Sequence, residues 1–280
     1  MKLNPNKKEG KFADVPVRVK SWAYIIVVFV GAVSNIWLMA GFTAWLTFQS
    51  LREFKNMFEL SYKFATLSVV LSGAQIALPY FCPDYGHYIV WVLIITLLSQ
   101  IVLWFIEKKQ LESHPQILLC IPIAFFAFGH LTYIRNFSVS TFGDDFFGIK
   151  CIVFLVVVTE FNDVFQYLSG KFFGKRQISP KISPNKTIEG LLGGLFFTLL
   201  LSNILAFLLP VSSFLTVSAI GLVIGLLGFL GDMLVSYLKR EAKVKDTGSL
   251  IPGHGGLLDR MDSLIFNAPL FYGIILYGFG

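Results

Sequence analysis

Long apolar runs dominate this chain of 280 residues and restrict the folds that it can adopt. A helix that crosses a bilayer needs roughly 20 mostly apolar residues. Runs of about this length occur near residues 22–49, 63–81, 87–106, 116–134, 146–168, 189–209, 213–238 and 263–279. Charged residues make up only 14% of the chain, against about 25% in soluble domains. We therefore predict an all-α, polytopic bundle of transmembrane helices, because the strands of a membrane β-barrel would alternate in polarity.

The loops between the runs predict which helix ends share a side of the membrane. Basic residues crowd the loops 169–188 and 239–262, whereas the connections near 82–86 and 210–212 contain no Lys or Arg. Cytoplasmic loops of membrane proteins are enriched in Lys and Arg, so both basic loops are expected in the cytoplasm. These loops also explain much of the net charge of +6, which therefore gives no reason to expect nucleic acid as a partner.

The first apolar run decides how many times the chain crosses. The segment 1–21 is basic and is therefore expected in the cytoplasm as well. Eight crossings would place it outside, so either the run 22–49 crosses twice or one run is not a span. We expect eight or nine spans and favour nine. The run of helices in 22–145 is interpreted as a scaffold, and residues 146–280 as the half that carries the chemistry.

Three polar clusters at the ends of apolar runs are candidate sites, because ionisable groups in membrane helices are costly and mostly functional. In the first cluster, Glu160, Asp163 and Tyr167 have the spacing of one helical face. Two acids on one face could hold a divalent cation. The alternative is that the helix reaches water here and that these side chains are solvated, and the cluster alone favours this alternative.

The second cluster directly precedes the predicted helix 189–209. Ser183, Lys186 and Thr187 lie before this helix, and Glu189 lies in its first turn. Backbone N–H groups at a helix N-terminus bind phosphate, and a lysine adds a positive charge. The same residues also fit a capping box, in which Ser or Thr caps the helix and Glu lies in the first turn. The two interpretations are compatible.

The third cluster runs from Asp232 to Asp262 and is the densest. Residues 236–262, the signature segment, read S-x-L-K-R-x4-K-D-x-G-x2-I-P-x-H-G-G-L-x-D-R-M-D. The aspartates, including Asp259, are hard oxygen ligands of the kind that Mg²⁺ prefers, and the glycines allow a ligand to approach the backbone. His254 could act as a general base or donate a hydrogen bond to phosphate. Together the clusters predict phosphoryl or nucleotidyl transfer.

The signature segment resembles that of the CDP-diacylglycerol synthases (phosphatidate cytidylyltransferases), with no departure across its 27 positions. The pair Gly231-Asp232 and the element 183–190 also resemble this family, so the similarity covers about residues 155–265. One departure is the segment 163–167, where many members have a small residue before the tyrosine. It indicates a divergent bacterial branch and bears on which lipid is the acceptor.

The resemblance implies a reaction and a set of site residues. CTP and phosphatidic acid would form CDP-diacylglycerol and pyrophosphate, by in-line attack of a phosphatidate oxygen on the α-phosphorus of CTP, with Mg²⁺ alone or together with K⁺. The metal ligands would be Asp232 and Asp259, supported by Asp163, Asp246 and Asp262. The other catalytic residues would be Lys239, Arg240, Lys245, Asp246, His254 and Arg260. The nucleotide would contact Ser183, Lys186, Thr187, Glu189, Gly255 and Gly256.

Other functions fit only part of the sequence. A CTP-dependent lipid kinase would transfer the γ-phosphate, and the full signature segment argues against it. A transporter would carry its charges at mid-span, whereas these charges lie at span ends and in loops. A CDP-alcohol phosphatidyltransferase needs a DGxxAR…GxxxD helix, which the sequence lacks. The resemblance implies a multi-pass protein of the inner (cytoplasmic) membrane, with its active site facing the cytoplasm, and a homodimer.

Overall fold

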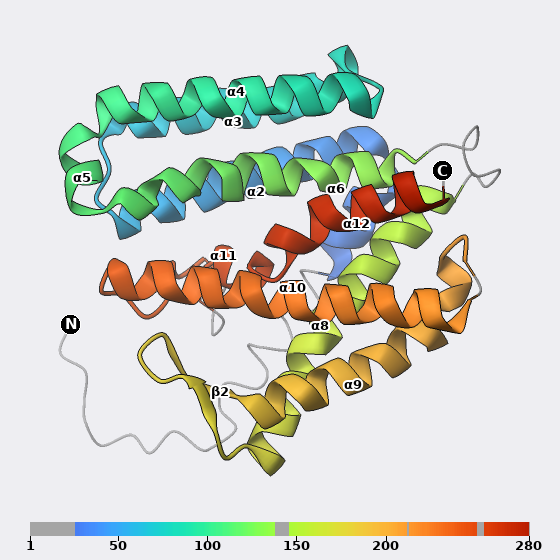
Figure 1. Cartoon of the computed structure of the whole chain (residues 1–280). Coiled ribbons are helices and arrows are strands. Elements are labelled where there is room, and N and C mark those ends of the chain that lie inside the picture. The colour runs from blue at the N-terminus through green and yellow to red at the C-terminus, as the bar shows by residue number, and fades with distance from the viewer. Residues whose placement is uncertain (1–25, 138–145, 212, 251–254, 280) are drawn as a thin grey trace.

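The structure is a bundle of helices with one short β hairpin (Figure 1). The computed structural model of the chain describes residues 26–137, 146–211, 213–250 and 255–279. The predicted helical bundle is confirmed, but the class all-α needs one correction. The predicted loop 169–188 contains the antiparallel strands β1 (Gln177–Ser179) and β2 (Ser183–Thr187). Strands this short contain too few residues to show an alternating pattern, so they cannot be predicted from the sequence.

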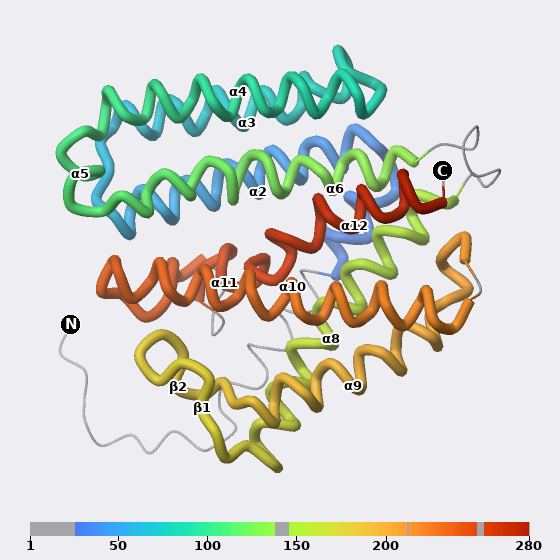
Figure 2. The backbone as a smooth tube through the Cα atoms, in the orientation of Figure 1, coloured from blue at the N-terminus to red at the C-terminus, as the bar shows by residue number. Residues whose placement is uncertain are grey.

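The two halves of the chain are stacked on each other (Figures 1 and 2). The N-terminal half consists of α2 (Ile36–Met57), α3 (Tyr62–Phe81), α4 (Tyr85–Ile106), α5 (Lys108–Ser113), η1 (Pro115–Leu119), η2 (Pro122–Ala127) and α6 (Phe128–Arg135). The C-terminal half consists of α8 (Phe147–Phe173), the hairpin, α9 (Ile188–Ile204), η3 (Ala206–Leu208), α10 (Phe214–Glu241), α11 (Leu258–Met261) and α12 (Leu264–Phe279). The α3–α4 pair forms one outer layer and α8 with α9 the other, while α12 packs on α6 and α10 between them.

The first apolar run is broken rather than continuous. Residues 26–34 are helical, and α2 begins after Asn35, whose Oδ1 accepts a hydrogen bond from the Trp37 amide at 2.8 Å. An asparagine in this position is an N-cap and marks the start of a new helix. A broken run is compatible with the prediction that residues 22–49 cross the membrane twice. Residues 1–25 lie outside the described part of the chain, so the number of crossings stays a prediction.

Within the described residues, five helical segments are long and apolar enough to cross a membrane. They are Tyr62–Phe81, Tyr85–Ile106, Pro115–Arg135, Phe214–Glu241 and Leu258–Phe279. The segment Tyr85–Ile106 has a mean hydropathy of 2.6 and is only 22% buried, so it faces lipid. The segment Pro115–Arg135 is 78% buried, which places it inside the bundle. The chain is therefore a multi-pass membrane protein, and a total of eight or nine spans stays a prediction.

A buried amide holds three helices of the C-terminal half together. The Asn162 side chain of α8 is fully buried; its Nδ2 donates to the Gly225 carbonyl oxygen of α10 at 3.2 Å, and its Oδ1 accepts from Thr198 Oγ1 of α9 at 3.0 Å. Lipid offers no hydrogen-bond partner, so a polar group at this depth must find its partners in the protein. The helices that carry the three polar clusters are thereby fixed relative to one another.

Gly231 provides a test of how closely α10 approaches the turn before α12. A Cβ added at Gly231 would overlap the backbone carbonyl oxygen of Asp262, which cannot move away by changing rotamer. We expect Gly231→Ala to destabilise the protein by about 1–3 kcal/mol, measured as a lower melting temperature in detergent. The control is Gly273→Ala, because a Cβ there meets nothing within 4 Å. Equal melting temperatures for the two variants would contradict the close approach.

Candidate functional site

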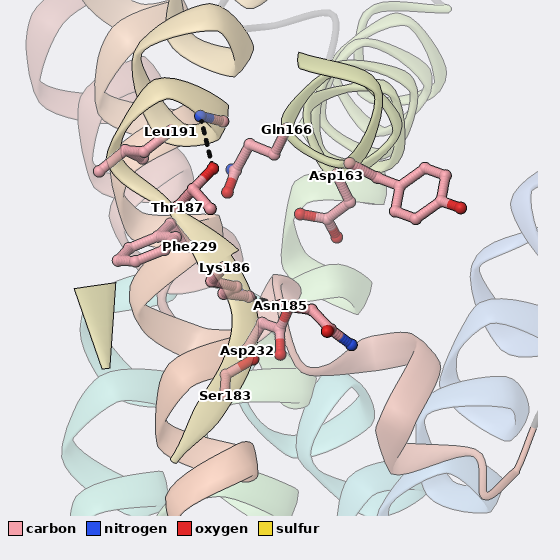
Figure 3. Close-up of a pocket in the computed structure, with 11 residues that line it drawn as sticks. Asp163, Gln166, Ser183, Asn185, Lys186, Thr187, Leu191, Phe229 and Asp232 are labelled. Carbon is pink, nitrogen blue, oxygen red and sulfur yellow. Dashed lines mark hydrogen bonds and ion pairs between the residues drawn. The ribbon is translucent and has the colours of Figure 1, made fainter. Parts of the chain in front are cut away.

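One cavity gathers residues from all three polar clusters. It lies between the last turns of α8, strand β2, the start of α9 and the middle of α10, and it encloses about 220 Å³ (Figure 3). This polar cavity is lined by Asp163, Gln166, Tyr167, Ser183, Asn185, Lys186, Thr187, Gly190, Leu191, Phe229 and Asp232. Clusters that are far apart in the sequence therefore form a single candidate site.

A lysine and an aspartate form an ion pair in the wall of the polar cavity. Lys186 Nζ of β2 lies 2.5 Å from Asp232 Oδ2 of α10, and these side chains are 18% and 27% exposed. The same ammonium lies 4.6 Å from the centre of the Phe229 ring, which is a cation–π contact. Ser236 donates to the other oxygen of Asp232 at 3.2 Å, as their predicted position on one helical face requires. Both charges are thus held in place beside the cavity.

Two nitrogen donors in the polar cavity have N–H groups that no hydrogen bond uses in the described structure. The buried Gln166 Nε2 has no acceptor, and Lys186 Nζ is paired with Asp232 but makes no well-directed hydrogen bond. Buried donors without acceptors are rare in folded proteins, and each one calls for an explanation. Asp163 projects from α8 toward the same space (Figure 3). The polar cavity therefore offers donors for an anion next to carboxylates for a cation.

Thr187 caps α9 and holds it close to α8. Its Oγ1 accepts a hydrogen bond from the Gly190 amide at 3.1 Å. The predicted cap is thereby confirmed for Thr187. A Cβ at Gly190 would lie 2.9 Å from the Gln166 carbonyl oxygen and 3.0 Å from Thr187 Oγ1. Only glycine leaves room for this approach, which brings the start of α9 against the cavity wall.

Glu189 has different partners from those that a capping box requires. Its carboxylate accepts hydrogen bonds from the backbone amides of Lys175 and Arg176 at 2.9 and 3.1 Å, and from Arg176 Nε at 3.0 Å. Glu189 lies before the apolar part of α9. Hydrogen bonds from the two backbone amides and the guanidinium lower the pKa of its carboxyl group to about 2. Glu189 fastens the turn after α8 and does not line the polar cavity. The contact of Glu189 with the nucleotide stays a prediction. These hydrogen bonds do not favour it.

Asp259 is bound on both of its oxygens by the loop 239–262. Lys239 Nζ donates to Oδ1 at 2.7 Å. The other oxygen, Oδ2, accepts from the Thr247 amide at 2.9 Å, from Thr247 Oγ1 at 3.0 Å and from the Gly256 amide at 3.0 Å. In the described structure Asp259 is therefore the centre of this loop, and Lys239 balances its charge.

The predicted metal ligands do not all line one cavity. Asp163 and Asp232 line the polar cavity, and the charges of both act on the buried Asp262 nearby, which accepts a hydrogen bond from the Ser263 amide at 2.9 Å. Asp259 is bound within its loop. Among the residues that the structure describes, no group of three or more His, Cys, Asp or Glu is placed to hold a metal ion. Mg²⁺ often takes only one or two carboxylates and completes its shell with phosphates and water. Asp163 and Asp232 fit that requirement, and the full set stays a prediction.

Arg240 joins the two basic loops. Its Nε donates to the Ile182 carbonyl oxygen in the hairpin turn at 3.1 Å. The two loops therefore lie at the same end of the bundle, as their predicted placement on one side requires (Figure 2). Arg260 lies on α11 and borders a separate, mainly apolar groove together with Glu160.

The remaining predicted residues belong to the signature segment. Some of them are described by the structure, and His254 is not. Lys245 and Asp246 are exposed. Gly255 has a φ of 83°, which favours glycine, and a Cβ there would approach Asp246 Oδ1 to 3.7 Å. His254 lies outside the described residues, so neither of its two predicted roles can be compared with a position.

Sequence reasoning missed Glu53 of α2, which lies in the half interpreted as a scaffold. Its carboxylate accepts hydrogen bonds from the amides of Leu257 and Leu258 at 2.8 and 2.9 Å. The first apolar run was predicted to end at residue 49, so an acid just beyond it resembled a solvated helix end. Helix α2 continues to Met57 instead, and this places Glu53 inside the protein.

Comparisons with known proteins agree on one family. Residues 16–277 match the model of the cytidylyltransferase family. An uncharacterized protein, YnbB, of Escherichia coli (strain K12) is 34% identical over 278 residues, which are 96% of this chain and 90% of that protein. A phosphatidate cytidylyltransferase of Bacillus subtilis (strain 168) is 41% identical over 133 residues, 47% of this chain and 49% of that enzyme. Another, from Staphylococcus aureus (strain COL), is 33% identical over 188 residues, 64% of this chain and 69% of that enzyme. The chain thus aligns with about half the length of the Bacillus enzyme.

Lys186→Met tests whether the polar cavity binds a phosphate anion. The change removes the cation and leaves Asp232 in place, so the cavity becomes more negative. A hydrogen bond to a charged group contributes about 1.5–3 kcal/mol, so we expect the affinity for magnesium pyrophosphate, measured by calorimetry in detergent, to fall about tenfold or more. Lys181→Met is the control, because Lys181 is exposed in the same hairpin. An affinity for Lys186→Met equal to that of the control would exclude Lys186 from anion binding.

Proposed function

This chain belongs to the cytidylyltransferase family, and on that premise we propose that it transfers the cytidylyl group of CTP to phosphatidic acid. The products are CDP-diacylglycerol and pyrophosphate. The observation that carries the proposal is the polar cavity, where the Lys186 ammonium and the unpaired Nε2 of Gln166 lie beside the carboxylates of Asp163 and Asp232. The triphosphate of CTP with a bound divalent cation has the charges that match these groups.

The hydrogen-bonding state of the polar cavity supports triphosphate binding. Lys186 is paired with Asp232 in the described structure, and a phosphate oxygen would give its ammonium a second, well-directed acceptor. Thr187 Oγ1 accepts from the Gly190 amide, so its own hydroxyl hydrogen can donate to a phosphate. Ser183, at the start of β2, lines the same cavity and adds another hydroxyl.

The polar cavity also supports binding of a metal ion with the nucleotide. Asp163 and Asp232 would hold Mg²⁺, alone or with K⁺, and the ion would neutralise the triphosphate and polarise its oxygens. Asp232 keeps its orientation through the hydrogen bond from Ser236. Lys186 pairs with Oδ2 of the same carboxylate and would share the phosphate charge with the metal.

The proposed reaction needs positioning more than proton transfer. An oxygen of the phosphatidate headgroup forms a bond to the α-phosphorus of CTP, and the bond from that phosphorus to the bridging β-phosphate oxygen breaks. Pyrophosphate leaves with the electron pair. The attacking phosphate is already anionic near neutral pH, so neither a general base nor a covalent enzyme intermediate is required. The protein would hold the two substrates in line and compensate their charge. Lys186 is the cation among these candidates that lines the polar cavity; a part for Lys239, Arg240, Lys245 and Arg260 rests on the signature segment alone.

The helix that carries Asp163 supports a lipid substrate. On other faces of α8 than the one that lines the cavity, apolar side chains near Asp163 in sequence are exposed: Phe161 (48%), Val164 (46%) and Leu168 (41%). In a membrane protein such a surface faces acyl chains, so a lipid headgroup can reach the cavity while its tails stay in the bilayer. We place this active site on the cytoplasmic side of the inner membrane, where CTP is available, and propose a homodimer.

A labelling assay tests the reaction directly. Purified protein in detergent receives phosphatidate, Mg²⁺ and CTP labelled at either the α- or the γ-phosphate. We expect α-label in a chloroform-soluble product, no γ-label there, and no product when a chelator removes the metal. Transfer of γ-label to lipid would identify a lipid kinase instead. The proposal fails if neither label reaches lipid with any divalent or monovalent cation.

Two charge-removing variants test the assignment of the metal ligands. Asp232→Asn should lower turnover by roughly 10²–10³-fold and raise the Mg²⁺ concentration that gives half-maximal rate, because a carboxylate in the polar cavity is lost. Asp259→Asn should also lower turnover, because the asparagine NH₂ group would face the backbone N–H donors that Asp259 accepts from. It should leave the Mg²⁺ requirement unchanged. Near-normal turnover of Asp259→Asn would remove Asp259 from the site, and a shifted Mg²⁺ requirement would make it a metal ligand.

A further inference from the structure

Glu53 is a buried carboxylate of the N-terminal half that binds the signature segment. Its side chain is on α2, and the residue is only 2% exposed. Oε1 accepts from the Leu257 amide at 2.8 Å and from Gln49 Nε2 at 3.2 Å. Oε2 accepts from the Leu258 amide at 2.9 Å and from Thr247 Oγ1 at 2.7 Å. Each oxygen thus accepts two hydrogen bonds, and three of the four donors belong to the signature segment.

The carboxylate of Glu53 is bound by three amide groups and one hydroxyl. Among the described residues, no Lys, Arg or His forms an ion pair with it. A buried carboxylate of this kind is strongly destabilising if its donors are removed, because nothing else offsets its desolvation. The three hydrogen bonds to the signature segment therefore satisfy Glu53 and also hold that segment in place. Leu257 and Leu258 directly precede Asp259 and Arg260, so the fixed backbone is the one that carries these side chains.

Two glycines of the signature segment make room for Glu53. A Cβ at Gly256 would lie 2.6 Å from Glu53 Oε2 and 2.7 Å from the Gly248 amide nitrogen. A Cβ at Gly248 would lie 3.3 Å from the carboxyl carbon of Glu53. The glycines of the signature segment are predicted to leave space for a ligand. At these two positions the space is taken by a side chain from α2 instead.

Thr247 couples Glu53 to Asp259. Its hydroxyl lies 2.7 Å from Glu53 Oε2 and 3.0 Å from Asp259 Oδ2, and its single hydrogen can serve only one of them at a time. Its amide donates to Asp259 at 2.9 Å. Asp259 in turn accepts from Lys239 of α10. A continuous chain of contacts thus leads from α2 through the signature segment to α10, the helix that carries Asp232.

We propose that Glu53 is a positioning residue of the cytidylyltransferase site. It holds Thr247 and the backbone of Leu257 and Leu258, and so keeps Asp259 and Lys239 in the orientation that the reaction uses. The kinetic part of this proposal rests on the proposed function, whereas the attachment of the loop to Glu53 does not. A scaffold role alone would change stability without changing turnover of the folded protein.

Glu53→Gln tests the proposal with little change of shape. The side-chain amide of glutamine would direct N–H groups at the N–H and O–H donors of the loop. These donors would therefore lose acceptors. We expect kcat to fall by about 10- to 100-fold, with little change in the KM for CTP, because the polar cavity is untouched. Hydrogen exchange of a peptide covering 245–260 should become faster. Glu112→Gln, an exposed glutamate on α5, is the matched control and should behave as wild type.

Each outcome of this experiment supports or overturns the proposal. The proposal is overturned if Glu53→Gln folds and has wild-type kcat and wild-type hydrogen exchange. It is also overturned if hydrogen exchange is faster but kcat stays at the wild-type value. If Glu53→Gln does not fold, Thr247→Val and Thr247→Ser replace it: loss of kcat in the valine variant alone supports the proposal, and equal kcat overturns it. If wild-type protein makes no lipid product, the proposed function fails, and the exchange comparison still decides whether Glu53 holds the loop.

Discussion

Hydrocarbon offers no hydrogen-bond partner, so every polar group inside this bundle has to be satisfied by the protein. The N-terminal half meets this requirement between helices: Gln75 Nε2 of α3 donates to the Phe125 carbonyl oxygen at 2.6 Å, and Thr43 and Thr132 share a hydrogen bond of 2.9 Å. The C-terminal half meets it through Asn162. Such bonds are modest in energy, about 0.6 kcal/mol on average, but they fix which faces of the helices meet.

The candidate site depends on that fixed packing at one end of the bundle. Helices α8 and α10 supply Asp163 and Asp232, and the hairpin between α8 and α9 supplies Lys186. Arg240 ties the hairpin to the end of α10. None of these elements carries enough polar groups alone to bind a nucleotide. Their combination gives both signs of charge within one cavity, which suits a phosphate ligand that brings its own cation.

Much of this arrangement could be predicted from local sequence. Apolar runs indicate the helices, and Thr187 has both the residue type and the place of an N-cap. Polar residues at the ends of apolar runs indicate the site. Features that depend on distant partners could not be predicted in this way. The engagement of Asp259 depends on how the loop folds back, and Glu53 is recognisable only once α2 is placed beside a segment about 200 residues later. The hairpin is too short for its strands to show a period.

The distance in sequence between Glu53 and its partners has a consequence for biosynthesis. Chains are made from the N-terminus, and early segments pack before later ones exist. Helix α2 is therefore complete while its carboxylate still lacks the amide of Leu257, which is added 204 residues later. Until then the nascent bundle carries a carboxylate that lacks three of its four hydrogen-bond donors. The signature segment supplies these donors when it is made, so the part of the candidate site that is synthesised last also completes the hydrogen bonds of a helix in the first half.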